Sequence, residues 1–449
     1  MASNLLNTLE KIERGRKKCI QLANEVNYPL PEDASLEEIA QCINAQGYAD
    51  EYYDSYKAWF SKDFSALPDG KVRLPDEIET LGSKAFYYAE NIDIIWPRQL
   101  KTIGQYAFYH ATFKDGVCEI PNHVTELGAY SFYECLGQTF TVPNSVTNMG
   151  NNAFNHSSGT MYYDGRVSVL NSGVFGNSNA GATGNGLKIH MTPESISCIE
   201  KINYNAFGQC QMYQLPWHDG VTFTGTDVFK NTIWNVPCVL DKNVYYTYNG
   251  VDKISSNMFY GSHFKEGFEW TECEVSTMDN YAFQNTRFNQ DIVKIPESIT
   301  TLGMSTFSGV RRLTDETHTS QYIDRFEFLS KELFDTSAGQ SVYDSYYNNF
   351  IIHAKEVKMG HTMFKMSSTS TACGSVIFLN ITKVPDIQSS VFNSSNLTKG
   401  NAYVYVPDDL VAEAKAKQYW SNISARIKPL SEWPLYSEYT EHILPREEV

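Results

Sequence analysis

Hydrophobic positions in this chain recur as a short phrase rather than as long amphipathic segments. The clearest copy spans residues 120–132, and the same spacing returns in residues 142–154 and 295–307. A copy has an apolar residue before a proline, another three positions after it, then Leu or Met followed by Gly, and a closing Phe. Internal repetition of this kind is typical of stacked architectures, so the pattern predicts a solenoid.

The closing phenylalanine gives the length of the repeat. Successive copies lie 21–32 residues apart, which predicts about thirteen stacked units over residues 66–400, with loops inserted in some of them. The closing positions are Phe86, Phe108, Phe132, Phe154, Phe175, Phe207, Phe229, Phe259, Phe283, Phe307, Phe334, Phe364 and Phe392.

The residues before the proline predict a short strand with one buried face. Two apolar residues separated by one other precede it, as in Cys118 and Ile120, and this period of two is the strand period. The proline lacks a backbone donor and ends the strand, after which the chain turns back into the core. Three positions past the Phe a small residue recurs, which predicts close packing at Ala89, Ala111, Cys135 and Cys210.

The residue between the two buried strand positions is expected to point away from the core. Stacked in a solenoid, such residues form a stripe that is typical of recognition faces. An ordinary solvated sheet face remains the alternative. The stripe residues are Ile95, Glu119, Thr141, Gln214, Asn235, Lys294 and Tyr405.

The phrase resembles the BspA-like class of leucine-rich repeats, over about residues 68–400. Its units read roughly Ile-Pro-x-x-Val-Thr-x-Ile-Gly-x-x-Ala-Phe. The later units are degenerate, since residues 332–334 and 362–364 keep the Phe and lose the Ile-Pro. The resemblance implies a leucine-rich repeat fold and, because members are mostly surface adhesins and ligand-binding proteins, a role in binding rather than catalysis.

Residues 1–65 are expected to form a helical anchoring and oligomerisation segment. Residues 2–26 carry a heptad seam, interrupted by Arg16, which predicts either a coiled coil or one helix of a small bundle. Shorter helices are expected near residues 35–45 and 50–60. The first 45 residues are similar to N-terminal segments of bacteriophage virion appendage proteins, which by analogy favours a trimer. The seam residues are Leu5, Leu9, Ile12, Cys19 and Val26.

Residues 401–449 are expected to close the solenoid. Residues 402–410 predict a strand, which a helix follows to about Lys417, and the polar, acidic tail from Ser431 is expected to lie over a neighbour or stay mobile. The whole chain is therefore predicted to be an α+β repeat solenoid with a helical N-terminal domain and a C-terminal strand-helix cap.

Composition and motifs exclude several functions. The net charge of −16, from 36 basic and 52 acidic residues, argues against nucleic acid or an anionic membrane as partner. No apolar run is long enough for membrane insertion, and no apolar signal core opens the chain. The nine cysteines form no Cys-x-x-Cys pair and so predict no zinc, and their odd number favours a reducing compartment. No catalytic motif, metal or cofactor site is evident, so we expect a protein that is not an enzyme.

These observations lead to two hypotheses. In the first, the chain is a structural bacteriophage head or tail fibre, assembled in the host cytoplasm as a homo-oligomer. Its N-terminal segment binds other virion proteins, and its repeats bind a host cell-surface glycan or protein. In the second, it is a bacterial or protist BspA-like surface adhesin or interaction scaffold. An enzyme with a grafted site is only a formal alternative.

Overall fold

The computed structural model describes residues 17, 72–73, 78–177, 186–242, 245–248, 251–314, 321–335, 340–364, 373–392, 397 and 401–445. The predicted N-terminal seam of Leu5, Leu9, Ile12, Cys19 and Val26 lies outside these residues. Two compact units make up the chain, residues 1–180 with 185–199 (unit 1) and residues 181–184 with 200–449 (unit 2).

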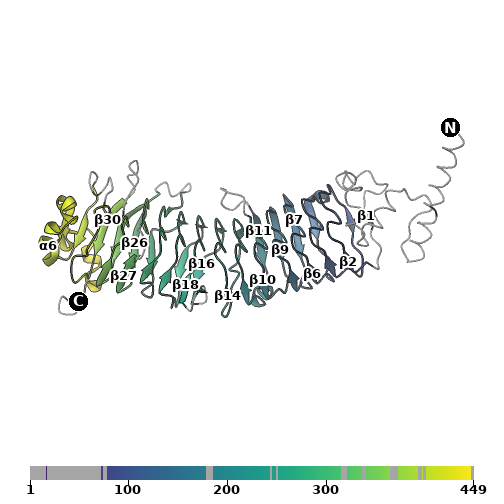
Figure 1. Cartoon of the computed structure of the whole chain (residues 1–449), viewed down its shortest axis with the longest axis horizontal. Helices are drawn as coiled ribbons and strands as arrows, with labels where there is room; N and C mark the ends of the chain where they lie inside the picture. The colour runs from purple at the N-terminus through teal and green to yellow at the C-terminus, as the bar shows by residue number, and fades with distance from the viewer. Residues whose placement is uncertain are drawn as a thin grey trace, which may run out of the picture. The chain divides into compact units, whose positions relative to one another are not determined.

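Unit 1 is a stack of coils that build two parallel ladders of short strands. Figure 1 shows strands of the second ladder, β7, β9 and β11, side by side. The first ladder consists of β2 (Thr80–Leu81), β4 (Thr102–Ile103), β6 (Glu126–Leu127) and β8 (Asn148–Met149), and the second of β5 (Val117–Glu119), β7 (Gln138–Val142), β9 (Gly159–Tyr163) and β11 (Leu187–Met191).

The smaller elements of unit 1 include one further strand pair and two short helices. This strand pair consists of β1 and β3, which are parallel. Thr192 caps α4, because its Oγ1 accepts a hydrogen bond of 3.1 Å from the backbone N–H of Ser195. The elements are β1 (Val72–Arg73), β3 (Ile94–Ile95), η3 (Lys114–Gly116), β10 (Val169–Leu170) and α4 (Pro193–Ser197).

The repeat contains one more strand than its sequence predicts. The segment after the proline, expected to be a turn, forms the two-residue strands of the first ladder. Their second residues, such as Leu127 and Met149, have no exposed surface. The turn therefore enters the core as a strand, because its backbone pairs with the coil before and the coil after it.

Unit 2 repeats this arrangement with additional strands. Its first ladder is parallel except for the antiparallel hairpin of β17 and β18. That ladder consists of β12 (Lys201–Ile202), β14 (Thr222–Phe223), β17 (Tyr246–Tyr248), β18 (Val251–Ile254), β21 (Thr277–Met278), β24 (Thr301–Leu302), β27 (Glu332–Asp335) and β29 (Glu356–Lys358), and the second of β13 (Gln211–Met212), β15 (Ile233–Trp234), β19 (His263–Phe264), β22 (Arg287–Phe288) and β25 (Arg311–Arg312).

Two further parallel ladders complete the strands of unit 2. Strands β16 (Cys238–Leu240) and β20 (Phe268–Trp270) form a pair. The six-stranded ladder, called the wide sheet below, consists of β23 (Ile292–Ile295), β26 (Ile323–Phe328), β28 (Tyr347–Ile352), β30 (Cys373–Phe378), β31 (Val404–Val406) and β32 (Ile427–Pro429).

The repeated phenylalanines form the core of both units. Twelve of the thirteen predicted residues are buried. In unit 1 the rings of Phe86, Phe108, Phe132 and Phe154 stack with centroids 5.0–5.1 Å apart. The spacing follows from the distance between coils, so one ring per coil fills the interior at every level.

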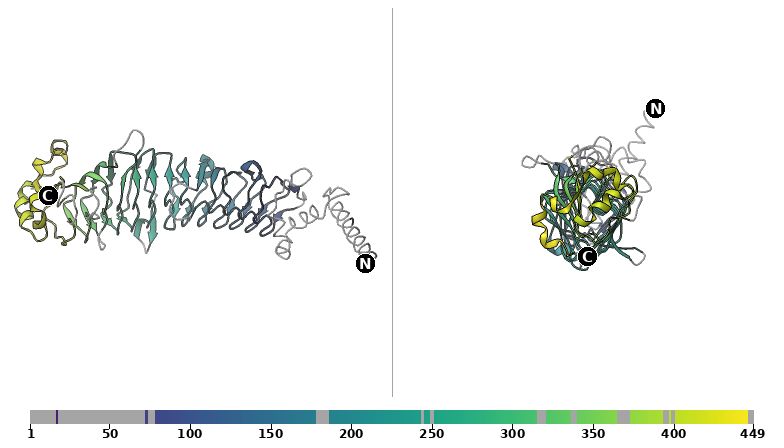
Figure 2. Two further views of the ribbon diagram at one scale, coloured as in Figure 1. Left: turned by 90° about the horizontal axis from the view of Figure 1, so that it is seen from above. Right: turned by 90° about the vertical axis from the view of Figure 1, so that its left-hand side faces the viewer.

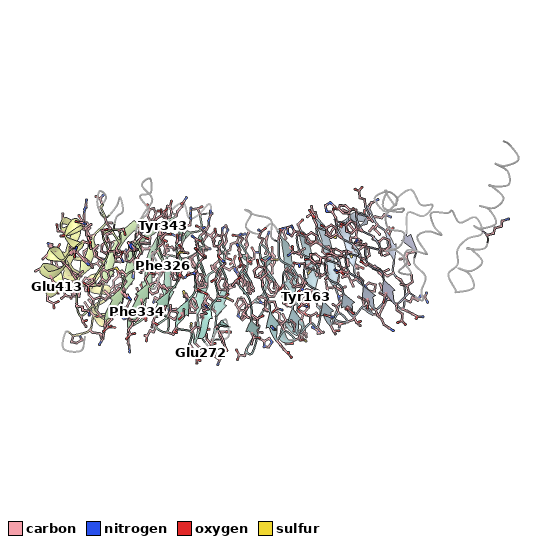
Figure 3. All side chains as sticks on the ribbon, in the orientation of Figure 1. Tyr163, Glu272, Phe326, Phe334, Tyr343 and Glu413 are labelled. Atoms are coloured by element: carbon pink, nitrogen blue, oxygen red, sulfur yellow. The ribbon has the colours of Figure 1, made fainter. Side chains whose placement is uncertain are left out.

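Phe334 is the exception, and the prediction for it was wrong. It is only half-buried on β27, whose buried residues are Leu333 and Asp335. The Phe position of this coil is held by Val342, because the Phe307 N–H donates to the carbonyl of Ser341 (2.7 Å) and the Val342 N–H donates to that of Met363 (3.2 Å). Figure 3 shows Phe334 and Tyr343, the neighbour of Val342, at opposite edges of the unit.

The small residues three positions past the Phe pack closely, as predicted. Ala89, Ala111, Cys135 and Cys210 have no exposed surface. Where the residue has a hydroxyl, it donates to the carbonyl of the Phe in the preceding coil. These bonds are Ser157 to Phe132 (2.7 Å), Thr232 to Phe207 (2.9 Å), Ser262 to Phe229 (2.6 Å), Thr286 to Phe259 (3.1 Å) and Ser345 to Phe307 (2.6 Å).

This bond between coils can be tested at Thr286. Replacing it with valine keeps the side-chain shape and removes the donor, so we expect unfolding to become easier by about 1–2 kcal/mol. Thr286→Ser retains the hydroxyl and is the control. Urea unfolding followed by circular dichroism measures the effect. If Thr286→Val unfolds at the same urea concentration as the control, the bond contributes nothing.

The chain after β31 forms short helices. These are η4 (Asp408–Leu410), α6 (Val411–Ala416) and η5 (Trp420–Arg426). The indole of Trp420 is fully buried and donates to the carbonyl of Pro385 (2.9 Å). In Figure 2 these elements are drawn in yellow at the C-terminal end of unit 2.

Residues 430–443, called the C-terminal segment below, lie against the wide sheet. The expectation that the tail covers a neighbour or stays mobile was wrong for these residues. Apolar side chains of the segment, Leu430, Trp433 and Tyr439, pack in one cluster with Ile351, Ile377 and Tyr405 of the sheet. Its turns are η6 (Leu430–Glu432), η7 (Tyr436–Glu438) and η8 (Thr440–His442).

Candidate recognition surfaces

Four of the predicted stripe residues lie where the sequence places them. Glu119 on β5, Thr141 on β7 and Lys294 on β23 are exposed between buried neighbours, and Ile95 on β3 is 42% exposed. Glu119 and Thr141 are paired in register, so they are adjacent on one face of unit 1. Lys294 belongs to unit 2. The predicted stripe is therefore present in part, as separate stretches in the two units.

The other three stripe residues are not exposed on a strand. Gln214 lies two residues beyond the end of β13 and is half-buried, because Met212 and Trp217 hold the core positions assigned to Tyr213 and Leu215. Asn235 follows the last residue of β15 and is also half-buried.

Tyr405 was also misassigned, for a different reason. Its strand and its direction are as predicted, yet only 4% of the residue is exposed. The C-terminal segment covers it, with Leu430 and Trp433 in the same cluster. Burial, the adjacent Tyr403 and Glu432 raise the pKa of the Tyr405 hydroxyl.

The exposed row on unit 1 continues with two residues that the sequence pattern did not identify. Thr141 pairs with Tyr162 on β9, and Tyr162 pairs with His190 on β11. Tyr162 is 52% exposed and its ring stacks on the His190 imidazole with centroids 5.4 Å apart. Neither strand is followed at once by proline, so the rule that located the other strands missed them. The signal available in the sequence was the alternation of apolar and polar residues along these two strands.

A second surface of unit 1 is built from tyrosines beside the buried Phe ladder. Tyr87, Tyr109 and Tyr133 stack with centroids 4.8–4.9 Å apart, and Tyr106 stacks on Tyr130 at 5.0 Å. Contacts of 4.6–5.8 Å join the two rows and Tyr88 into one patch. The tyrosine surface is defined as Tyr87, Tyr88, Tyr106, Tyr109, Tyr130 and Tyr133.

Two histidines border this surface. His110 contacts Tyr88 (4.7 Å) and His156 contacts Tyr133 (4.9 Å). Nδ1 of His110 lies 3.5 Å from a carboxylate oxygen of Glu134. Burial lowers the pKa of His156, so its ring is neutral at pH 7. The border therefore offers polar and titratable groups around an aromatic centre.

The hydroxyls of Tyr87, Tyr109 and Tyr133 stay protonated at neutral pH. Burial, with the neighbouring Tyr88 and Tyr109, raises the pKa of Tyr87 to about 12. Burial and nearby side chains raise the pKa values of Tyr109 and Tyr133 as well. The rings are therefore neutral groups that can donate and accept hydrogen bonds at their edges.

The described residues offer little for metal or thiol chemistry. Among them, no cluster of three or more His, Cys, Asp or Glu side chains could hold a metal ion. Their cysteines are free thiols, four of them buried. Burial raises the pKa of Cys135 to about 12, and those of Cys118 and Cys238 also rise, so these thiols are protonated and poor nucleophiles. No helix within the described ranges is long and apolar enough to cross a membrane.

Comparison with known proteins agrees with this fold. The sequence model of the family described as BspA type leucine rich repeat region matches residues 62–161, 117–236, 188–311 and 237–350, together more than half of the chain. No curated protein matches the chain significantly.

Three solved structures are similar. A leucine-rich repeat protein from Bacteroides ovatus is 14% identical, with 80% of this chain and 83% of that chain covered and a TM-score of 0.32. The pneumococcal vaccine antigen PcpA is 12% identical, with 80% and 77% covered and a TM-score of 0.34. A leucine rich cell surface protein from Faecalibacterium prausnitzii is 14% identical, with 72% and 89% covered and a TM-score of 0.25.

Proposed function

Because this chain belongs to the BspA-type leucine-rich repeat family, we propose that it is a non-enzymatic recognition protein. Its repeats display side chains that bind a cell-surface glycan or protein of a host, since stacked repeats present extended binding surfaces. The tyrosine surface of unit 1 is the observation that carries this proposal.

The tyrosine surface has the chemistry of a binding patch. Tyrosine gives a large contact area at a small entropic cost and carries a polar group at its edge, and it is enriched at interfaces. Stacked rings hold one another in place, with Tyr109 lying between Tyr87 and Tyr133. A ligand therefore meets a surface that is already ordered, which lowers the cost of binding.

Of the two settings predicted from the sequence, we carry forward the surface adhesin or interaction scaffold. The virion fibre, with its homo-trimer and its contacts to other virion proteins, rests on the first 65 residues, of which only Lys17 is described, and it stays a prediction. Antibodies against the chain separate the settings, because label on protruding virion fibres supports the fibre and label on cell envelopes supports the adhesin. In either setting, several copies would strengthen weak contacts.

The C-terminal helices and the C-terminal segment fit the predicted closing role. Stacks of repeats need ends that protect the last coil. Trp420 and Trp433 are almost fully buried at this end of unit 2, so we assign these residues to a cap.

The binding proposal is tested with the full chain on printed arrays of neutral and acidic glycans and of extracellular matrix proteins. We expect a bound ligand whose affinity falls at least tenfold in the double variant Tyr109→Leu, Tyr133→Leu, because leucine keeps apolar volume and lacks the ring and hydroxyl. Tyr204→Leu is the control, since Tyr204 is 51% exposed and lies in unit 2.

Thermal unfolding of the variants distinguishes the loss of contacts with the ligand from the loss of the folded structure. A double variant that melts like the wild type and binds tenfold more weakly supports the proposal. A chain that binds nothing on either array, or a folded double variant that binds as tightly as Tyr204→Leu, contradicts it.

A further inference from the structure

Three basic side chains form a column on the second ladder of unit 2. His263 pairs with Arg287, and Arg287 pairs with Arg311, on the parallel strands β19, β22 and β25. Each lies four residues after the stacked phenylalanine of its coil. Paired residues of adjacent strands are about 4.8 Å apart, so the repeat brings the three groups into line. We call these residues the basic column.

The basic column has no acidic partner in the described part of the chain. Arg287 makes no ion pair there. The guanidinium of Arg311 packs over the Tyr346 ring at 5.0 Å and its Nε donates to the carbonyl of Gly309 (3.4 Å). The adjacent Arg312, in contrast, is 2.6 Å from Asp291.

Alignment of like charges is unfavourable in a sheet. Burial, together with the charges of Arg287, Lys265 and Arg311, lowers the pKa of His263 to about 4. Burial and Arg311 lower the pKa of Arg287. In a chain of net charge −16, the column is thus a local positive field, which a bound anion would neutralise.

A pocket of about 300 Å³ adjoins the column at Arg311. Its wall combines two tyrosines with two amides and one carboxylate. Tyrosine rings can pack against the face of a sugar ring, and amides and carboxylates can form hydrogen bonds with sugar hydroxyls. Asp344 would repel an anion inside the pocket, so an acidic group is expected over Arg287, at the column. The polar and aromatic lining residues are Gln284, Asn285, Tyr343, Asp344 and Tyr346.

From this arrangement we infer that the basic column and the adjoining pocket bind an acidic saccharide. Its carboxylate or sulfate group lies on Arg287 and Arg311, where guanidinium groups can hold two oxygens at once. The sugar ring occupies the pocket between Tyr343 and Tyr346. The site belongs to unit 2, so it does not depend on the tyrosine surface of unit 1.

The test measures binding of the full chain to four polymers by surface plasmon resonance. Heparin offers sulfate, polygalacturonate offers carboxylate, dextran is neutral, and duplex DNA is a polyanion without an acidic sugar ring. We expect heparin or polygalacturonate to bind and dextran and DNA not to. Arg287→Gln and Arg311→Gln should each weaken binding at least tenfold. Arg426→Gln is the control, because it removes the same charge and Arg426 also packs over a tyrosine, Tyr403 (5.6 Å).

The melting temperature of Arg287→Gln shows whether Arg287 serves binding or serves the stability of the fold. His263 is neutral at pH 7, so Arg287→Gln removes one of two aligned guanidinium charges and relieves repulsion. The melting temperature of this variant should therefore stay the same or rise, whereas loss of a structural contact would lower it. The inference is overturned if neither acidic polysaccharide binds. It is also overturned if Arg287→Gln and Arg311→Gln bind like Arg426→Gln, or if duplex DNA binds as tightly as the polysaccharide. If only the double variant Tyr109→Leu, Tyr133→Leu loses binding, the result concerns the tyrosine surface of unit 1 and does not contradict this inference.

Discussion

Replacing Phe283 with alanine is expected to lower the free energy of unfolding by about 3–5 kcal/mol. The ring is fully buried and stacks on Phe259 at 5.1 Å and on Phe307 at 5.4 Å. Its removal leaves a cavity at one level of the ladder and takes a contact from the coils on both sides. Urea unfolding followed by circular dichroism gives the change in midpoint.

Phe334→Ala in the same unit is the matched control. The sequence gives both residues the same place in the repeat, while the structure leaves Phe334 half-exposed on β27. A loss of about 1 kcal/mol or less is expected there, as for partly exposed positions that leave no cavity. Equal losses in the two variants would contradict the assignment of Val342 to the core position.

The ladder could be predicted from the sequence because one buried position recurs with one residue type. Its failure at Phe334 has a physical cause. The coil after Phe307 contains β25, β26 and β27, as the coil before it contains β22, β23 and β24, but it runs 35 residues to Val342, where the coil before it runs 24 residues from Phe283. The backbone hydrogen bond from Phe307 to Ser341 then fixes the register. Valine fills that position. The true spacing from Val342 to Phe364 is 22 residues, the common spacing of the repeat.

The candidate surfaces were predicted less completely. The alternation of apolar and other residues located Glu119, Thr141 and Lys294, because successive side chains of a strand point to opposite faces of the sheet. Tyr405 could not be judged in this way, because what covers it comes from residues later in the chain. Tyr439 donates to the carboxylate of Glu327, 112 residues away, and such contacts leave no local pattern.

The tyrosine surface did have a signal in the sequence. Tyr follows the closing Phe directly in three successive units, at Tyr87, Tyr109 and Tyr133, and precedes it by two in two of them. The count of 29 tyrosines does not say which of them meet. The stacking of coils brings them together. The basic column was missed because its members are 24 residues apart and align only when the coils pair.

Replacing Trp433 with alanine is expected to detach the C-terminal segment from the wide sheet. Trp433 is 2% exposed, its ring lies 4.9 Å from that of Tyr439, and its Nε1 donates to Oδ1 of Asn349 (3.2 Å). Truncating a buried tryptophan costs about 3–5 kcal/mol, which is large for so short a segment. Limited proteolysis with chymotrypsin should then cleave the segment faster by at least tenfold.

Trp433→Phe is the control, because it keeps an aromatic ring and loses the hydrogen bond, at a cost of about 1 kcal/mol. The ion pair of Arg325 with Glu438 (2.8 Å) is partly exposed and so adds little, which leaves the apolar cluster as the main attachment. If Trp433→Ala resists chymotrypsin as well as Trp433→Phe does, the polar contacts hold the segment instead. If the segment is released, Tyr405 becomes exposed beside Ile377. Its row on the wide sheet then leads through Ile351 and Glu327 to Lys294, so the stripe predicted from the sequence continues across the sheet.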